Sequence, residues 1–512
     1  MINWMKKTYH IIFTVLIGVL LGYLLCYSTV SIFYDNIDSV ILFQPNNWIT
    51  LVFPVLLLLV LLGIMWQFIL NDKIEWCVGL LVISLVIKLF WVINFPLQYY
   101  FDMTTLMDYA KDIVTIPDTL PFTGYHYLRF YGYNLPATFL NVFYVFVFGE
   151  NMALIGARIF NVFYLIGIDL CIWFIAKEIS NRKIANFTLL ISVLFFPFTG
   201  LSNVVYNDVN STFLLLIAIS FFVHFVKVNQ WKYLAWAGVF LILGNFLRSI
   251  GVIFFLAAGL YLLLNRKVKL ALQFGTALFV GLFTVQFLFQ MTMIKTGVLV
   301  ESEKSIAIPA THYVLVGLST GVHSASPGYY YPYLAYYIGE NGGYDRDEYS
   351  QWVAREIGNR VKELGVAGVL NHGLQKFFVQ WGDGTFEMAI INNLISNKDD
   401  SPITFEYATP FHRWLLESEI AIKVLVKYCR IFWVAMIAVI FAGNFIRKRQ
   451  KEEYLLKLII MGFMGFYLLW ETSPHYSFAA LPFFVLLFGQ SFSQIIELLK
   501  VKGGNYLDKS KI

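Results

Sequence analysis

Charged side chains are scarce in this chain: of 512 residues, Lys, Arg, Asp and Glu make up 13%. A soluble globular protein carries roughly 25%, so the deficit excludes a soluble enzyme. The chain is also 59% hydrophobic, which excludes disorder, because a disordered chain combines low hydrophobicity with high charge. The net charge of +5 is small and dispersed, so no nucleic-acid partner is expected.

Metal-binding and disulfide patterns are absent too. All four cysteines lie inside apolar runs without paired spacing, so we expect them to pack as small apolar residues. The histidines of the long polar segment show no metal-ligand spacing, and no glycine-rich phosphate loop is present. The sequence therefore predicts no metal site and no nucleotide hydrolysis. The cysteines are Cys26, Cys77, Cys171 and Cys429.

Long apolar runs are what the sequence has instead, and a run of about 20 such residues crosses a bilayer. They predict an all-α polytopic membrane protein with about twelve transmembrane helices. The first run follows Lys6 and Lys7 but contains no cleavage site, so it is interpreted as a retained helix. The runs lie near 10–33, 48–70, 75–95, 152–177, 184–201, 210–227, 232–247, 249–265, 269–294, 421–446, 454–471 and 476–498.

The orientation depends on one further apolar stretch, Asn134 to Gly149. If it spanned the membrane, the basic loop from Lys177 to Lys183 and the later basic loops would change side. Treating it as an interfacial segment places most basic loops on one side, which the positive-inside rule makes cytoplasmic. The basic residues between 423 and 430 run against this assignment.

The opposite, external side then collects the polar segments. The loop 295–420 holds 15 acidic against 8 basic residues from Thr296 to Glu419 and has its own helical pattern at 346–365, which predicts a small external lobe. The predicted organisation is an N-terminal transmembrane module (1–294) with a catalytic external loop (96–151), the lobe (295–420), and C-terminal helices with a cytoplasmic tail (421–512).

Ionisable residues at helix ends are the informative ones, because a charge in hydrocarbon is costly. Asp102 follows the third run and Asp208 lies in a short external turn, so both carboxylates belong to the same membrane level. A cap and a turn residue are the simpler readings. Arg248, at a break between two runs, needs an anionic partner: a carboxylate, a lipid head group or a substrate phosphate.

Several other residues are weaker candidates. Lys88 lies inside the third run, where snorkelling to head-group phosphates is the first interpretation. Asp108 is on the same predicted helix as Asp102, and its first interpretation is a residue of the solvent-exposed face of that helix. Glu471, His475 and Tyr476 form the polar interruption between the last two runs. Tyr330 belongs to a tyrosine-rich segment that fits sugar stacking or an interfacial aromatic belt.

The order of these features resembles the C-type superfamily of polytopic glycosyltransferases, in its bacterial branch near protein O-mannosyltransferases and the aminoarabinose transferase. The features are an acidic residue soon after a span, an interfacial helix, a span beginning Ala157-Arg158-Ile-Phe-Asn161, a basic turn and an external turn with Asp208. The resemblance covers about residues 75–290. Glu471 to Tyr476 is similar to a Glu-x-x-x-Arg-Tyr segment of some members, with His475 in place of Arg, and three spans precede the acidic loop instead of one.

The resemblance implies a sugar donor linked to polyprenyl phosphate and transfer at the external face, with inversion. Asp102 would be the general base and Asp208 would orient the acceptor. The phosphate would be held by Arg248 with Arg158, Lys88 or His475 in support. The substrate-binding candidates are Asp108, Glu471, Tyr476 and Tyr330. No cofactor is expected, with a bridging divalent cation as the alternative.

The acceptor stays open: a glycan, a lipid or a protein. A bacterial plasma membrane fits the charge pattern. Three other functions remain: a transporter or flippase of lipid-linked saccharides, which would need ionisable groups near the midplane; a polysaccharide polymerase or ligase, expected to carry many external arginines; and an accessory subunit without activity.

Overall fold

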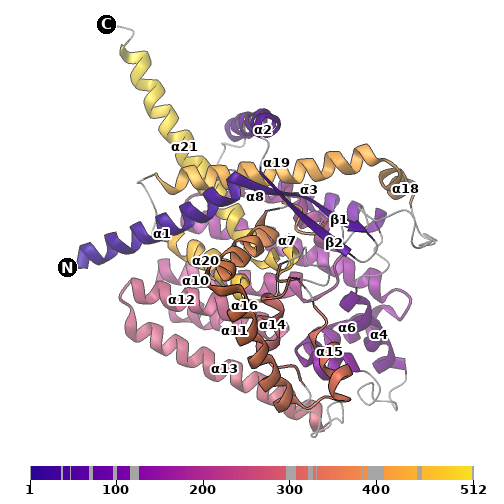
Figure 1. The fold of residues 1–512 in the computed structure, drawn as a ribbon. Helices are drawn as coiled ribbons and strands as arrows, with labels where there is room; N and C mark the ends of the chain where they lie inside the picture. The colour runs from indigo at the N-terminus through magenta and orange to yellow at the C-terminus, as the bar shows by residue number, and fades with distance from the viewer. Residues whose placement is uncertain are drawn as a thin grey trace.

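A computed structural model shows a bundle of helices with one small sheet (Figure 1). The structure describes residues 2–35, 38–45, 48–68, 73–95, 101–115, 126–295, 307–320, 327–329, 331–382, 384–388, 409–446 and 452–509.

Every predicted apolar run contains a helix, or two helices joined at a bend. In chain order these are α1 (Ile2–Cys26), α2 (Trp48–Phe68), α3 (Ile74–Asn94), α7 (Ala153–Ile179), α8 (Arg182–Leu194) with α9 (Phe196–Gly200), α10 (Asn207–Val228), α11 (Trp231–Leu247), α12 (Gly251–Leu264), α13 (Val268–Lys295), α19 (Glu419–Asn444), α20 (Glu453–Leu469) and α21 (Leu481–Lys509).

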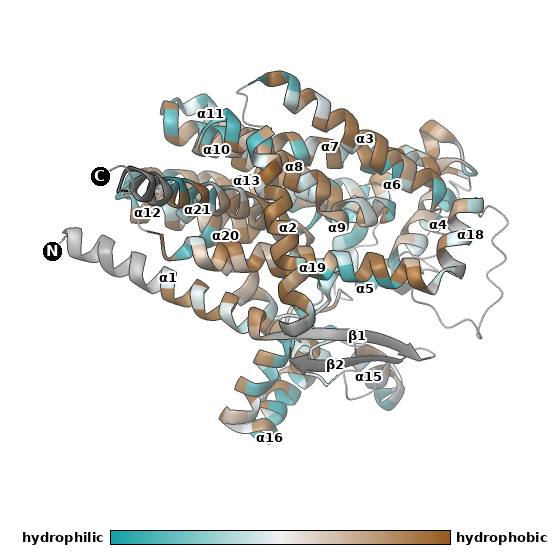
Figure 2. Ribbon diagram, turned by 90° about the horizontal axis from the view of Figure 1, so that it is seen from above, coloured by the Kyte–Doolittle hydropathy of each residue, from teal (hydrophilic) through white to brown (hydrophobic). Residues whose placement is uncertain are grey.

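The helical membrane fold is confirmed, but the count of twelve spans is not. Within the described residues, seven helices are long and apolar enough to cross a membrane, or eight if the pair bent by 57° at residue 195 is one span. Many apolar side chains on α2 and α3 stay exposed, among them Phe53, Val60 and Val86, and Figure 2 shows both helices as largely hydrophobic. Such surfaces belong against lipid.

The N-terminal region departs from the prediction. The first helix was expected over 10–33, but α1 ends at Cys26 and is followed by an antiparallel hairpin of β1 (Tyr27–Asp35) and β2 (Asp38–Pro45). Tyr27 pairs with Pro45 and Asp35 with Asp38, with an irregularity between Thr29 and Ser31. The run Thr29 to Phe33 is β-branched and aromatic, and such residues favour a strand over a helix.

Shorter elements connect the long helices. They are α4 (Phe101–Thr115), α5 (His126–Phe130), η1 (Gly132–Asn134), α6 (Leu135–Phe148), η2 (Leu201–Asn203), α14 (Thr311–Gly317), α15 (Tyr333–Asn341), α16 (Arg346–Trp381), α18 (Pro410–Glu417) and η4 (Pro474–Ala480). The helix predicted at 346–365 is the first part of α16, which Asp345 caps and which bends at Gly365 (φ 61°).

α4, α6, α15 and α18 gather on one side of the bundle, at the right in Figure 1, whereas the N-terminus lies at the left. We call the side of the bundle that carries α4, α6, α15 and α18 the α4 side. The 14 residues of α6 extend only about 21 Å, less than the roughly 30 Å of a bilayer core. α6 is therefore too short to span alone; its interfacial position stays a prediction.

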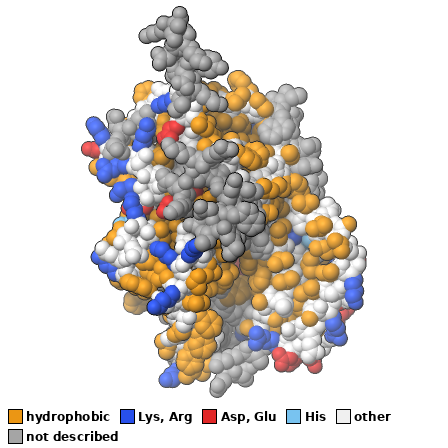
Figure 3. Space-filling model, turned by 90° about the vertical axis from the view of Figure 1, so that its left-hand side faces the viewer, with side chains coloured by type: hydrophobic (Ala, Val, Ile, Leu, Met, Phe, Trp, Pro, Cys, Tyr) orange, Lys and Arg blue, Asp and Glu red, His pale blue; other side chains and the backbone are white. Residues whose placement is uncertain are grey.

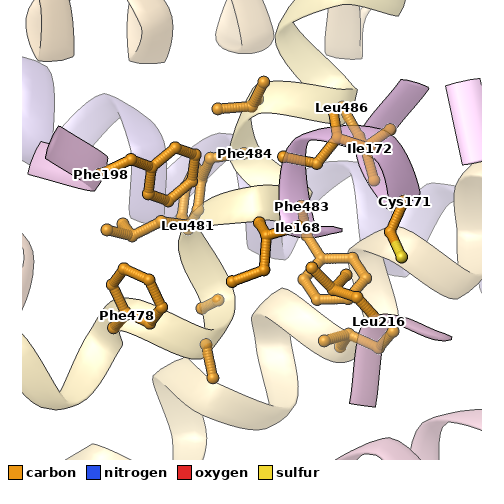
Figure 4. Packing of buried hydrophobic residues seen from close by; sticks show 14 of the residues in the cluster. Ile168, Cys171, Ile172, Phe198, Leu216, Phe478, Leu481, Phe483, Phe484 and Leu486 are labelled. Carbon is orange, nitrogen blue, oxygen red and sulfur yellow. The ribbon is translucent and has the colours of Figure 1, made fainter. Parts of the chain in front are cut away.

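The bundle core lies where α7, α10 and α21 meet. Figure 4 shows Ile168, Cys171 and Ile172 of α7 against aromatic and leucine side chains of α21. The cysteines at 77, 171 and 429 are buried thiols outside any disulfide, as predicted, whereas the one at 26 is exposed. Helices in lipid gain little from the hydrophobic effect between them, so this close packing provides much of the cohesion.

Lys88 forms a buried ion pair instead of snorkelling to the membrane surface. Its ammonium lies 2.5 Å from the carboxylate of Asp169 on α7, and the two side chains are 1% and 0% exposed. Ser84 and Ser192 donate to the same carboxylate at 2.6 and 2.5 Å. The prediction that Lys88 supports the donor phosphate is therefore wrong, because its charge is matched inside the bundle.

We predict that Lys88→Met destabilises the protein by about 3–5 kcal/mol, because it leaves the Asp169 carboxylate buried without its counter-ion. The double variant Lys88→Met/Asp169→Leu should recover most of this loss, since replacing both charges removes the desolvation cost. Thermal unfolding of the purified protein in detergent measures both effects. Equal destabilisation by the single and double variants would contradict this account.

Candidate active site on the α4 side

Asp102 lies in the first turn of α4, where the positive end of the helix dipole favours a carboxylate. The next residues on its buried side, Met103 and Leu106, are 1% and 0% exposed and fix the rotation of α4 about its axis. The sulfur of Met103 accepts from the backbone N–H of Val205 at 3.0 Å. These contacts bring Asp102 to the turn before α10.

Two tyrosine hydroxyls surround the Asp102 carboxylate. Tyr127 donates to it and Tyr206 interacts with it. Asn134 holds both tyrosines: its Nδ2 donates to Tyr127 at 2.8 Å, and its Oδ1 accepts from Tyr206 at 2.9 Å. Burial raises the pKa of Asp102, and the bond from Tyr127 and the charge of His475 lower it only in part. A raised pKa suits a carboxylate that must accept a proton.

Arg248 was expected to need an anionic partner, and in the structure this partner is the carboxylate of Asp208. The two form an ion pair at the start of α10, with side chains 13% and 6% exposed. The Arg248 guanidinium also lies 5.3 Å from the ring centre of Tyr476. Both Asp102 and Arg248 interact electrostatically with Tyr206. The structure therefore brings the two predicted key residues to one place.

His475 lies next to these residues in η4. Its Nδ1 contacts the carboxylate of Glu387, which also accepts from the Ser473 hydroxyl at 2.7 Å. The His475 imidazole also interacts electrostatically with the carboxylates of Asp102 and Glu471. His475 and Asp208 line one small pocket together with Val204. We call this group the Asp102 cluster: Asp102, Asp208, Arg248, Glu387, Glu471 and His475.

Glu471 is a member of this cluster whose pKa is strongly raised. Its pKa is raised to about 7, chiefly by burial; the charges of Asp102 and Glu387 also raise the pKa, whereas those of His475 and Lys376 lower it. Lys376 on α16 has a pKa lowered to about 7, chiefly by burial. Its ammonium donates to the carbonyls of Leu468 and Trp470 at 3.0 and 2.7 Å. Both groups therefore titrate near neutral pH.

A cavity of about 300 Å³ adjoins the cluster. Asn245 and Ser249 line it on either side of Arg248, and Tyr133 lines it from η1. Its other walls are mainly apolar side chains of α6, α11 and α13, such as Phe246 and Phe289, which pack edge to face at 4.9 Å. The cavity therefore has mainly apolar walls with a few polar groups, and two of these, Asn245 and Ser249, are close to Arg248 in the sequence.

Arg158 is 3% exposed on α7, and its Nε and Nη2 atoms have no hydrogen-bond partner among the described residues. One turn along the helix, Asn161 donates to the carbonyls of Val204 and Ser202 at 2.5 and 3.4 Å. Arg158 thus lies on the part of α7 that packs against the connection leading to Asp208. A buried guanidinium with unused donors is suited to an anion.

Two other predicted residues are not in the cluster. Asp108 points to solvent and pairs with Lys111 at 3.3 Å, three residues further along α4, so a substrate-binding role is not supported. Its spacing of six residues from Asp102 places it on a different face of the helix. Tyr330 lies outside the described residues.

Sequence reasoning missed Glu387 and the tyrosines at 127 and 206. Glu387 lies between the apolar residues Phe386 and Met388, and an acid in an apolar stretch was the available sign of a buried partner. Tyr206 directly precedes the Asn207-Asp208 turn, but a tyrosine near a membrane surface has no distinctive pattern.

Comparison with known proteins finds a family similarity in the central part of the chain. Residues 137–319 match the family described as dolichyl-phosphate-mannose-protein mannosyltransferase. The chain is similar to that family over these residues. The match confirms the resemblance predicted from the sequence, and it includes Arg158, Asp208 and Arg248. No curated protein sequence matches the chain.

Two solved structures are similar at low sequence identity. One is the crystal structure of ArnT from Cupriavidus metallidurans bound to undecaprenyl phosphate, with 11% identity, a TM-score of 0.36, and coverage of 82% of this chain and 78% of that chain. The other is the archaeal oligosaccharyltransferase AglB from Archaeoglobus fulgidus in complex with an inhibitory peptide and a dolichol-phosphate, with 12% identity, a TM-score of 0.31, and coverage of 81% and 56%.

We predict that the folded state loses stability as pH rises from about 4.5 to about 7, because the pKa of Glu471 is raised in the folded protein. Its folded pKa of about 7 exceeds its ordinary 4.5, so in this window the folded state binds more protons than the unfolded state. Glu471→Gln should flatten this part of the curve relative to wild type. Parallel melting curves for the two proteins between pH 4.5 and 7 would contradict the assignment.

Proposed function

We propose that this protein is a membrane glycosyltransferase that moves a sugar from a polyprenyl-phosphate donor to an acceptor, with inversion at the anomeric carbon. The observation that carries the proposal is the convergence of Asp102 and Arg248 on Tyr206, beside a chain segment that matches a mannosyltransferase family. A carboxylate and a guanidinium in one buried group supply the two charges that this reaction needs.

Asp102 is the general base in this proposal. Transfer requires the acceptor hydroxyl to lose its proton as its oxygen attacks the anomeric carbon. Tyr127 orients the carboxylate, while burial raises its pKa towards the working pH. Asp208 is engaged by Arg248, so it is the weaker candidate for taking the proton and the better one for orienting the acceptor.

The phosphate left behind would be stabilised by cations on the opposite side of the reacting carbon. Arg248 lies beside the cavity, His475 faces the same pocket as Asp208, and Arg158 has donors without a partner among the described residues. Incoming phosphate would share Arg248 with Asp208, so donor binding would also loosen the Asp208–Arg248 pair. Charge-assisted hydrogen bonds of this kind strengthen in a buried site.

The cavity between α6, α11 and α13 suits the lipid part of the donor. Its walls are mainly apolar, and Asn245 and Ser249, on either side of Arg248 in the sequence, are among its polar lining residues. α13 exposes large apolar side chains along its length, including Phe279 and Phe283 at 70% and 65%, so this wall faces lipid. A prenyl chain could therefore remain in the bilayer while its phosphate reaches the cluster.

The site is proposed to face outward. Lys and Arg side chains occur on the face opposite to the α4 side (Figure 3). Lys227 lies in the last turn of α10, and Arg266 and Lys267 lie in the turn between α12 and α13. The positive-inside rule makes that face cytoplasmic and the α4 side external. A bacterial plasma membrane remains the expected location. The glycan, lipid or protein nature of the acceptor remains open.

The cofactor prediction also remains a proposal: no cofactor, with a bridging divalent cation as the alternative. The described residues include no group of three His, Cys, Asp or Glu side chains arranged to hold a metal. Assays with and without a strong chelator decide between the two, because a required cation would make transfer sensitive to its removal.

We predict that Asp102→Asn lowers the transfer rate about 10²- to 10⁴-fold, the usual contribution of a positioned general base. Donor binding should stay near the wild-type level, since the amide keeps the shape of the side chain. The measurement is transfer by purified protein or membranes with a panel of polyprenyl-phosphate sugars. Asp112→Asn, further along α4, is the matched control. A folded Asp102→Asn variant with the wild-type rate would disprove the base assignment.

We predict that Arg248→Ala raises the KM for the lipid donor about 10- to 100-fold, as expected for losing a charged hydrogen bond. The KM for the acceptor should change less. Arg248→Lys keeps Asp208 paired and preserves the positive charge, so its KM should lie between those of the alanine variant and wild type. An unchanged dependence on donor concentration in Arg248→Ala would count against the phosphate role.

A further inference from the structure

Glu387 carries a buried carboxylate for which the transfer reaction itself has no use. It lies after α16, is 3% exposed, and accepts from the Ser473 hydroxyl at 2.7 Å. The same oxygen contacts Nδ1 of His475. One carboxylate oxygen therefore holds two side chains of the segment that connects α20 to α21.

The backbone at Glu387 has an uncommon conformation that neighbouring side chains hold in place. Phe386 and Glu387 have φ values of 52° and 62°, in the left-handed region that non-glycine residues rarely adopt. Both neighbours of Glu387 are anchors: Phe386 packs edge to face against Trp433 at 5.0 Å, and Met388 is fully buried against Gly200. Strained conformations persist where the surroundings fix them, and they concentrate at functional sites.

A second clamp holds the His475 segment without help from Glu387. The Oε1 atom of Gln380 accepts from the backbone N–H of Ser473 at 3.1 Å, and its Nε2 donates to the Ser473 carbonyl at 2.7 Å. Nε2 also donates to the Ser477 hydroxyl at 2.5 Å. Removing the Glu387 carboxylate should therefore leave the backbone in place and change only how the imidazole is held.

Several charges face the imidazole from different elements. Glu387 contacts it from the segment after α16, Asp102 acts on it from α4, and Glu471 interacts with it from the same connection. Asp208, paired with Arg248, shares its pocket. The two ring nitrogens of a histidine point in different directions, and the bond at one nitrogen fixes the proton and direction of the other.

We propose that Glu387 is a positioning residue that accepts a hydrogen bond from Nδ1–H of the His475 imidazolium, in which both ring nitrogens carry a proton, and thereby directs its Nε2–H toward the phosphate released during sugar transfer. The proposal rests on the proposed glycosyltransferase function and deepens it. In the step, the acceptor oxygen bonds to the anomeric carbon and its proton passes to Asp102. The bond from that carbon to the phosphate oxygen breaks, and the electron pair stays on the phosphate, which accepts a hydrogen bond from Nε2–H.

A double-mutant cycle tests the proposal, with the polyprenyl-phosphate sugar that is active in the donor panel. We expect Glu387→Ala to lower kcat about 10- to 100-fold, the usual cost of losing a group that orients a functional histidine, with a smaller change in the acceptor KM. Glu387→Gln should recover part of the rate, since its amide oxygen still accepts from Nδ1–H. His475→Ala and Glu387→Ala/His475→Ala should be equally slow, because Glu387 acts through His475.

Binding of undecaprenyl phosphate provides a readout that does not depend on turnover. It should raise the melting temperature of wild type and of Glu387→Gln more than that of Glu387→Ala. Gln380→Glu, which disturbs the other clamp, controls for a general loosening of the segment. Losses that multiply in the double variant, or a wild-type rate in Glu387→Ala, would overturn the proposal. Absence of any sugar transfer by wild type would instead refute the proposed function.

Discussion

A charge that leaves water must meet an opposite charge or several hydrogen bonds, and this requirement organises the molecule. Lys88 and Asp169 join α3 to α7 inside the bundle, and Glu387 joins the segment after α16 to His475 in η4. Each pair connects parts of the chain that lie far apart in the sequence.

The interior of the bundle and the α4 side differ in how fully their buried charges are paired. Inside the bundle the ammonium of Lys88 has a carboxylate and a hydroxyl as partners. On the α4 side, three carboxylates share the surroundings of His475, the pKa of Glu471 rises to about 7, and Arg158 keeps donors without a described partner. A matched pair stabilises packing, whereas a cluster with unmatched groups is prepared for a ligand that brings its own charge.

The sequence predicts the elements well and their contacts only in part. The apolar runs predict the long helices because a bilayer demands them, and helix ends draw attention to Asp102, Asp208 and Arg248. The sequence cannot tell that Lys88 pairs inward, because its partner Asp169 comes from a helix 81 residues away. The sequence also cannot place Glu387 beside His475. Its position depends on a turn held by Phe386 and Met388, and apolar residues of this kind have no distinctive pattern in the sequence.

The central claim is that Asp102 and the cations of the cluster meet at one prenyl-linked phosphate. A structure determined with a non-hydrolysable polyprenyl-phosphate sugar bound tests it most directly. We expect the phosphate within hydrogen-bonding distance of Arg248 and His475, the prenyl chain in the cavity beside Phe246, and the anomeric carbon facing Asp102. A phosphate bound on the opposite face of the bundle, or a sugar directed away from Asp102, would contradict the account.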